Sequence, residues 1–220
     1  MVQNKKKAPV TKPAVSLEPK RRGRPRAYEP EVALGQALAL FRKDGFAATS
    51  LDDLSAATGM NRPSLYGAFG DKRQLYIKAY QRYREDYGAT VVEIFKADLP
   101  IRERLRQFYD AALDIYLLGG EGPRGCFTVM TVASDAIVDP EIRAMVLEGF
   151  QDLDKAFAWC FRTAAQKGEP LPSADIAVLA QMASATLYSL AIRARAGIPR
   201  KQLEAIVKGA VELLCGSKAG

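Results

Sequence analysis

Residues 49–72 read TSLDDLSAATGMNRPSLYGAFGDK, and this stretch decides the fold. Ser50 and Asp53 have the form of a capping box, with aspartate in place of the usual glutamate or glutamine, so a short helix begins here. Gly59 suits the left-handed turn that ends this helix, and Gly70 suits the end of a second one. Two short helices joined by a tight glycine turn predict a helix-turn-helix.

Outward from this stretch, the apolar spacing remains helical along most of the chain. Leu34, Ala37, Leu38 and Phe41 recur on one helical face just before it. Glycine and proline breaks separate the later segments. The predicted helices cover residues 30–45, 50–59, 61–70, 71–96, 101–118, 125–137, 140–167, 173–196 and 200–215. No segment has a convincing strand pattern, so the predicted fold class is all-α.

Positive charge is concentrated at the N-terminus. Residues 1–28 hold nine Lys and Arg against one acidic residue, Glu18, whereas the other 192 residues hold 23 basic and 24 acidic groups. The segment is rich in proline and has no apolar periodicity, which is typical of a disordered chain. Such a basic tail predicts an arm that binds nucleic acid. The alternative is a solubilising leader or an expression remnant.

The composition argues against an enzyme and against a metal site. There is no histidine, which excludes a Ser-His-Asp triad and a histidine-based metal site. Cys126, Cys160 and Cys215 lie far apart in the sequence, so we expect neither a zinc site nor a cofactor. The odd number of cysteines and the lack of a secretory signal predict a reducing, cytoplasmic location. The uncharged run 176–192 is short for a membrane span and contains polar residues, so it predicts a buried helix–helix interface.

The central stretch also resembles the signature of the TetR family of transcriptional regulators. In that family a glycine-hydrophobic turn, here residues 59–60, precedes a recognition helix that ends in Tyr-x-x-Phe-x-x-Lys. This motif is present as Tyr66, Phe69 and Lys72, and the resemblance is strong over residues 30–85. It implies an N-terminal three-helix helix-turn-helix DNA-binding domain, followed by a larger C-terminal helical ligand-binding and dimerisation domain.

The resemblance assigns base reading to the start of the recognition helix. Asn61, Arg62 and Ser64 lie there, where side chains reach base edges in the major groove. Arg62 is the best match to a bidentate contact with guanine.

Three other residues are implied to position the protein on the DNA backbone. Ser50 can donate to a phosphate, Tyr66 would touch a phosphate or a thymine methyl group, and Lys72 would pair with a phosphate. Core packing is the alternative for Tyr66, and we favour it for Phe69. Lys72 could instead be a solvated first-turn residue, although a cation at a helix N-terminus opposes the helix dipole.

The arm contains Arg22-Gly23-Arg24-Pro25-Arg26, which is similar to the core of an AT-hook. In such a segment Arg22, Arg24 and Arg26 enter the narrow minor groove of A·T tracts. A looser attraction to phosphates is an equally supported alternative.

The C-terminal half has the aromatic content for an effector pocket between helices, although any one aromatic residue is more often part of the core. The candidate ligand-binding residues are Phe95, Phe108, Tyr109, Tyr116, Cys126, Met130 and Trp159. Cys126 follows a glycine at the expected start of a helix, where a thiol becomes more reactive, so it is a candidate sensor of electrophiles. The alternative is that Cys126 is a small buried hydrophobic residue.

The last two predicted helices are expected to form a homodimer as a four-helix bundle. The stripe expected at this interface on the first helix is Ala180, Ala183, Leu187 and Leu190. The stripe on the second helix is Leu203, Ile206, Val207, Ala210 and Leu214.

Three parts are therefore predicted: a disordered basic arm over residues 1–27, a DNA-binding domain over 28–75, and an effector-binding and dimerisation domain over 76–220. The expected function is that of a repressor that leaves a palindromic operator on double-stranded DNA when a small-molecule or electrophilic effector binds. One alternative is an architectural or effector-independent DNA-binding protein. Another is an enzyme or small-molecule carrier that contains a helical hairpin by coincidence.

Overall fold

The computed structural model describes residues 29–117, 125–134 and 139–216, and within these ranges the chain is helical and contains no strand. The helices are α1 (Pro30–Ala48), α2 (Leu51–Thr58), α3 (Arg62–Phe69), α4 (Lys72–Lys96), α5 (Ile101–Leu117), α6 (Phe127–Ser134), α7 (Pro140–Gln166), α8 (Ile176–Arg195) and α9 (Arg200–Leu214). The predicted all-α class is confirmed. The predicted basic arm, with Arg22, Arg24 and Arg26, lies outside the described residues.

The short helices form at the positions that the local signals predict. Ser50 caps α2 as one half of a capping box with Asp53, and Gly59 ends the helix in the left-handed conformation with φ 64°. Gly45, at φ 82°, interrupts the helical backbone of α1 near its end. Phe69 is buried, together with Leu54 and other apolar residues, so its assignment to the core is confirmed.

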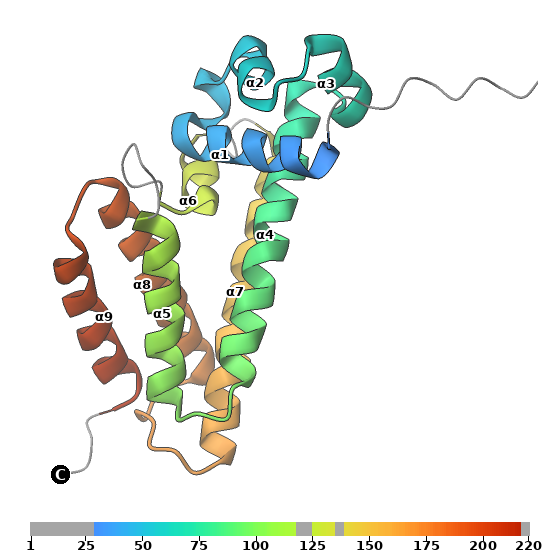
Figure 1. Cartoon of the computed structure of the whole chain (residues 1–220). Coiled ribbons are helices and arrows are strands. Elements are labelled where there is room, and N and C mark those ends of the chain that lie inside the picture. The colour runs from blue at the N-terminus through green and yellow to red at the C-terminus, as the bar shows by residue number, and fades with distance from the viewer. Residues whose placement is uncertain (1–28, 118–124, 135–138, 217–220) are drawn as a thin grey trace, which may run out of the picture.

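The helices form two parts joined by α4 (Figure 1). Helices α1, α2 and α3 gather around the N-terminal end of α4, which then continues into a bundle with α5, α7, α8 and α9. Helix α6 is short and packs against α1, α4, α7 and α8, so it lies where the two parts meet.

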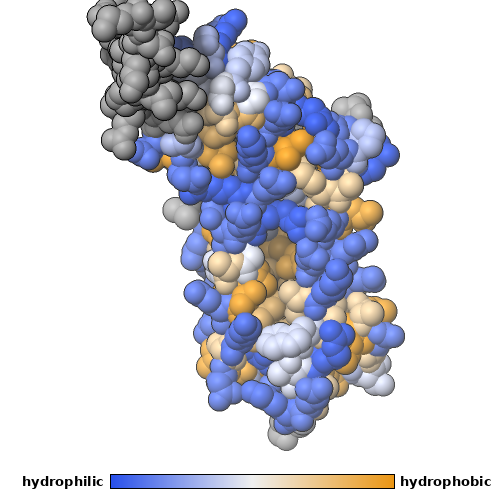
Figure 2. Space-filling model, turned by 90° about the vertical axis from the view of Figure 1, so that its right-hand side faces the viewer, coloured by the Kyte–Doolittle hydropathy of each residue, from blue (hydrophilic) through white to orange (hydrophobic). Residues whose placement is uncertain are grey.

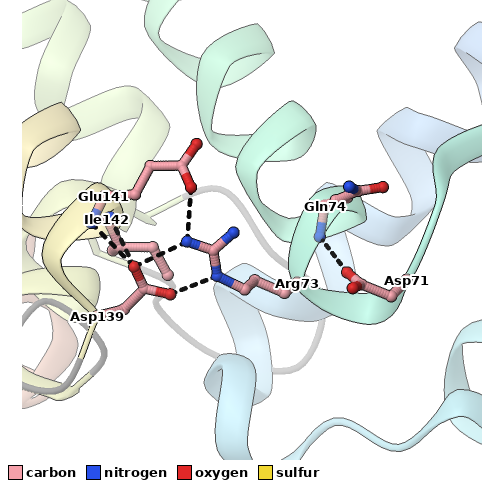
Figure 3. A network of polar contacts seen from close by, with 6 residues as sticks. All are labelled: Asp71, Arg73, Gln74, Asp139, Glu141 and Ile142. Atoms are coloured by element: carbon pink, nitrogen blue, oxygen red, sulfur yellow. Dashed lines mark hydrogen bonds and ion pairs between the residues drawn. The ribbon is translucent and has the colours of Figure 1, made fainter.

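Arg73, in the first turn of α4, ties that helix to the start of α7 (Figure 3). Its guanidinium donates to Asp139 at 2.9 Å and to Glu141 at 2.6 Å. Asp139 also caps α7, because its carboxylate accepts the backbone N–H groups of Glu141 and Ile142. One carboxylate therefore orders the start of α7 and anchors α4, around whose N-terminal end α1, α2 and α3 gather.

This anchor should be visible in a pH titration. The hydrogen bond from Arg73 lowers the pKa of Asp139 to about 2. Since the folded-state pKa is depressed, the ion pair stabilises the fold above the ordinary pKa of an aspartate, and its contribution is lost as the pH falls towards 2. In Arg73→Ala the pKa of Asp139 should rise, but not fully to the ordinary value of an aspartate, because the hydrogen bonds from the backbone N–H groups of Glu141 and Ile142 remain.

The measurement is an NMR titration of the carboxyl carbons in both proteins. Asp98 is the internal control, because its pKa is lowered by Lys167 and not by Arg73. An Asp139 carboxyl that titrates at the same pH in both proteins would contradict the anchor.

The faces predicted for the dimer interface are wrong. Ala180, Ala183, Leu187 and Leu190 are buried inside the subunit, where α8 packs against α5, α7 and α9. The α9 stripe turns inward in the same way: Leu203, Val207 and Leu214 are buried, and Ile206 and Ala210 are half-buried. Helix α8 is apolar on more than one face, so apolar spacing alone could not distinguish the subunit's own core from a contact with a second subunit.

The outward face of α8 is also apolar. Val178 is 51% exposed, and Met182 and Ile192 are each 57% exposed. By length and composition alone α8 could cross a membrane. Its other face, however, supplies core residues to the helical bundle, as expected for the buried helix–helix contact that the sequence predicts.

Candidate nucleic-acid interface and effector cavity

Helix α3 presents a polar, exposed face at the end of the molecule. Leu65 and Phe69 fix the helix to the core, which leaves Arg62 and Tyr66 exposed on the other side. Ser64 is half-buried, so it is the least accessible of the three predicted base readers. The arrangement is that of a recognition helix whose N-terminal end is open to a partner.

Two of the predicted DNA contacts also serve as helix caps. The side-chain carbonyl of Asn61 accepts the backbone N–H of Ser64 at 2.9 Å, which leaves the amide NH₂ as its group for a base. The Ser50 hydroxyl accepts the N–H of Asp53 at 3.1 Å and donates to the Asp53 carboxylate at 2.6 Å. Ser50 would therefore have to exchange its bond to Asp53 for a bond to a phosphate.

Arg62 is held by a neighbour that sequence reasoning missed. Asp52, on α2, accepts hydrogen bonds from Arg62 Nε at 3.1 Å and from Nη2 at 2.7 Å. Both side chains are exposed, so the pair itself adds little to stability. A guanidinium has five N–H donors in a rigid fork, so this contact occupies one edge and leaves the Nη1 edge open to a base.

Lys72 lies at the N-terminus of α4 and packs on α1. Its Nζ is 4.3 Å from the centre of the Phe46 ring, which is a cation–π contact. The contact fixes the ammonium group close to α1, and it explains why a cation is tolerated at the start of a helix.

A cavity of about 320 Å³ lies in the larger half, walled by α4, α5, α7, α8, the start of α6 and the segment just before it. Figure 2 views the molecule from the side of α4 and shows apolar residues in a hollow between hydrophilic ones. Of the predicted ligand-binding residues, Phe108, Tyr116 and Cys126 line this cavity.

Four of the predicted ligand-binding residues are not part of the cavity wall. Phe95 and Tyr109 are buried in the core, where Phe95 stacks near Phe157 and the Tyr109 hydroxyl donates to the carbonyl of Ala183. Met130, on α6, lies close to Gly45 of α1. Trp159 is 43% exposed at the surface. Aromatic content marks buried positions, but it does not show which buried positions border a cavity.

Sequence reasoning missed three tyrosines in the cavity wall, Tyr83, Tyr87 and Tyr188. Two of them belong to a row of four on α4: Tyr76, Tyr80, Tyr83 and Tyr87. These positions fall on one helical face, so the spacing was a usable signal. Burial raises the pKa of the Tyr83 and Tyr87 hydroxyls, so both remain neutral at physiological pH.

The Cys126 thiol is buried beside these tyrosines. Tyr83 donates to its sulfur at 3.3 Å, and the Tyr83 hydroxyl also accepts the backbone N–H of Phe127 at 3.3 Å. Cys160 and Cys215 are buried elsewhere, and burial raises the pKa of each thiol to about 11. Among the three cysteines, Cys126 is the one in the cavity wall.

The segment around Cys126 is tied to α1. Arg42, on α1, donates to the carbonyls of Gly125 at 3.1 Å and Ile115 at 3.3 Å, and its guanidinium lies 5.4 Å from the centre of the Tyr83 ring. Arg195, at the end of α8, donates back to the carbonyls of Arg42 and Lys43. A displacement of Tyr83 in the cavity wall, or of Gly125 next to Cys126, is therefore a displacement of a group that contacts Arg42 on α1.

The described part of the chain holds no cluster of His, Cys, Asp and Glu side chains that could bind a metal ion. The polar groups of the cavity wall are hydroxyls, a thiol and the paired side chains of Arg84 and Asp152, and this arrangement is suited to binding.

Comparisons with known proteins match both halves of the chain. Residues 33–79 match the family model described as bacterial regulatory proteins, tetR family, and residues 102–210 match the tetracyclin repressor-like C-terminal domain. The transcriptional repressor ComR of Escherichia coli is 29% identical over 187 residues, which cover 84% of this chain and 88% of ComR. The repressor BdcR of the same organism is 32% identical over 126 residues, which cover 57% of this chain and 62% of BdcR.

Solved structures show the same architecture. A cysteine mutant of the regulator CifR, in complex with a 26-base-pair operator DNA, superimposes with a TM-score of 0.79 at 26% identity, over 87% of this chain and 100% of that one. Reduced NemR of Escherichia coli has a TM-score of 0.75 at 19% identity over 87% of this chain and 98% of NemR, which shows the common fold. The matches to both domains show that this protein belongs to the TetR family of DNA-binding transcriptional regulators.

Proposed function

We propose that the protein is a cytoplasmic, homodimeric repressor that binds a palindromic operator and leaves it when an effector occupies the cavity. The observation that carries this proposal is the link between the cavity and α1. Tyr83 and Gly125 both contact Arg42, and Arg195 holds the same part of α1 from α8. An effector that moves the cavity wall can thus favour one placement of the DNA-binding unit over another.

The names of the relatives support repression as the direction of regulation and operator DNA as the binding partner. ComR and BdcR are named as repressors, and CifR was solved with double-stranded operator DNA. A more distant relative, FasR, is named as an activator, so the direction of regulation is itself open to test. The proposed division is an arm over residues 1–27, a DNA-binding domain over 28–75 and an effector-binding and dimerisation domain over 76–220, with α4 crossing the second boundary.

The proposed dimer uses the outward faces of α8 and α9. On α8 the exposed apolar residues Val178, Met182 and Ile192 fall on one face, and on α9 Leu213 is exposed. Two copies of these faces around a two-fold axis would cover apolar surface that the single chain leaves open to water.

The test is selection of binding sites from random DNA, followed by footprinting of the selected site. We expect a protected palindrome with half-sites one helical turn apart or a multiple of it. An effector-independent DNA-binding protein would bind as tightly when the cavity is filled. That alternative can be examined with a variant such as Ala112→Trp, in which a large side chain occupies the cavity wall.

We expect the N-terminal arm to contribute affinity that does not depend on DNA sequence. Residues 1–27 carry a large excess of positive charge, and each phosphate that is neutralised adds roughly −0.9 to the slope of log affinity against log salt. Removal of residues 1–27 should flatten that slope by several units and weaken non-specific binding. A slope that stays the same after removal of the arm would show that the arm does not contact DNA. A triple variant with Arg22→Ala, Arg24→Ala and Arg26→Ala separates minor-groove insertion from attraction to phosphates. Insertion predicts a larger loss of affinity on A·T-rich flanks than on G·C-rich flanks, whereas attraction to phosphates predicts an equal loss.

The thiol of Cys126 gives a second expectation. If an electrophile acts at this position, Cys126 should be alkylated faster than Cys160, because Cys126 borders the cavity and Cys160 does not. Alkylation should release operator DNA, and Cys126→Ser should bind DNA while ignoring the electrophile. Mass spectrometry after brief exposure to iodoacetamide measures both rates. Equally slow labelling of the two thiols would identify Cys126 as a packing residue.

A further inference from the structure

Among the residues that the structure describes, the cavity wall offers a ligand no unpaired charge. Among its described lining residues, Arg84 and Asp152 are the charged ones, and they pair with each other at 2.7 Å. Arg84 also contacts Glu148 at 3.2 Å, so its charge is compensated twice. A charged ligand would lose its hydration on entry and gain no counter-charge, which is unfavourable.

The remaining walls are apolar and aromatic. Val91 and Ile94 of α4, Phe108 of α5, Leu153 of α7 and Leu187 of α8 line the cavity from different sides. Its volume of about 320 Å³ is at the small end of the range for ligand pockets. Such a space fits one or two fused rings.

Two buried hydroxyl groups have unused hydrogen-bonding capacity. Tyr116, on α5, is 0% exposed, and in the described part of the chain its hydroxyl makes no hydrogen bond of ordinary length and angle, although the Cys126 thiol lies near it. The hydroxyl of Tyr87, on α4, is also buried without a hydrogen bond of ordinary length and angle, although the Tyr83 side chain lies near it. Both residues line the cavity. Burial, and then the nearby Cys126 thiol, raise the pKa of Tyr116, so it remains a neutral donor and acceptor.

We propose that the effector is a neutral molecule of one or two rings that carries a hydrogen-bonding oxygen, and that this oxygen binds the hydroxyls of Tyr116 and Tyr87. The proposal rests on the proposed function, because it names the chemistry of the molecule that the regulatory cavity takes. A buried hydroxyl without a partner is unfavourable, so a ligand oxygen at this point gains more than the same oxygen would gain against an apolar wall. The rings lie against the aliphatic and aromatic walls, where burial of apolar surface supplies most of the affinity.

Three probes of nearly equal shape test this chemistry: naphthalene, naphthol and naphthoate. Isothermal titration with the full chain should give the tightest binding for naphthol, about threefold to tenfold tighter than for naphthalene. Naphthoate should bind at least about tenfold more weakly than naphthol, because its charge has no partner. Binding of naphthoate as tight as that of naphthol, or no binding of naphthol at all, would overturn the proposal.

Two variants locate the effect. Tyr116→Phe removes only the hydroxyl, so the advantage of naphthol over naphthalene should disappear while the affinity for naphthalene stays the same. Tyr109→Phe is the matched control on the same helix, because the Tyr109 hydroxyl is engaged by Ala183 outside the cavity. It should lower the thermal stability and leave the order of the probes unchanged. An undiminished preference for naphthol in Tyr116→Phe would show that the hydroxyl is not the binding group.

A second readout separates this proposal from the proposed function. Operator affinity is measured with and without saturating naphthol. Tight naphthol binding with unchanged operator affinity would support the ligand chemistry and contradict effector control. Operator release by naphthoate and not by naphthol would support effector control and overturn the ligand chemistry.

Discussion

Met182→Glu should convert the protein into a folded monomer that has lost tight operator binding. Met182 is 57% exposed on the outward face of α8, between the exposed Val178 and Ile192. A carboxylate there costs the single chain little, but in a dimer it would be buried without a partner. Because a palindrome is bound by two linked recognition helices, loss of the link should weaken operator binding by about a hundredfold or more. Light scattering and operator titration measure the two effects.

Leu187→Glu is the control for this prediction, because Leu187 lies on the opposite face of the same helix and is buried within the subunit. It should lower the thermal stability of the chain itself. A dimeric Met182→Glu protein would mean that subunits meet elsewhere, and Leu213→Glu on α9 would be the next variant to examine.

Arg62→Ala should weaken binding to the best operator by about ten- to a hundredfold, if Arg62 makes a bidentate contact to a guanine. The loss should depend strongly on one base pair, and the variant should tolerate substitution of that pair. Binding to a panel of operators with single-base changes measures this dependence. An even loss across the panel would assign Arg62 to a phosphate.

Two further variants separate the orientation of the Arg62 side chain from the effect of charge on DNA binding. In Asp52→Asn the carboxylate no longer holds Nε and Nη2 of Arg62, so discrimination at the base pair read by Arg62 should fall. Non-specific affinity should rise in the same variant, because a negative charge leaves the DNA-binding face. Lys72→Ala should weaken binding to every operator alike and reduce the salt slope by about one. Unchanged discrimination in Asp52→Asn would show that the ion pair does not orient the arginine.

The DNA-binding end could be predicted closely because its signals are short-range. The capping box of Ser50 and Asp53, the glycine turn at Gly59 and the cap at Gly70 each act within one turn of helix, and all three are present in the structure. Asp52 was missed for the opposite reason. It is ten residues from Arg62, and only the crossing of α2 and α3 brings the two side chains together.

The cavity could be predicted only in part. Phe108, Tyr116 and Cys126 border the cavity. Phe95 and Tyr109 are also aromatic and buried, but they pack in the core and do not border the cavity. The sequence predicts that an apolar side chain is buried, but it does not predict whether the space beside that side chain is filled by other atoms. The row of tyrosines on α4 is a local pattern that the sequence analysis did not use, and two of its four members, Tyr83 and Tyr87, border the cavity.

The sequence by itself determined the all-α class, the positions of most helices and the match of the recognition helix to the family motif. These features depend on apolar periodicity and on helix caps, which act within a few residues. The tertiary structure alone decided which face of α8 belongs to the core. Ala183 and Leu187 point inward and Met182 points outward, although all are apolar. Helical spacing reports that a face is apolar, whereas the neighbour that covers it depends on how α5, α7 and α9 are placed around it.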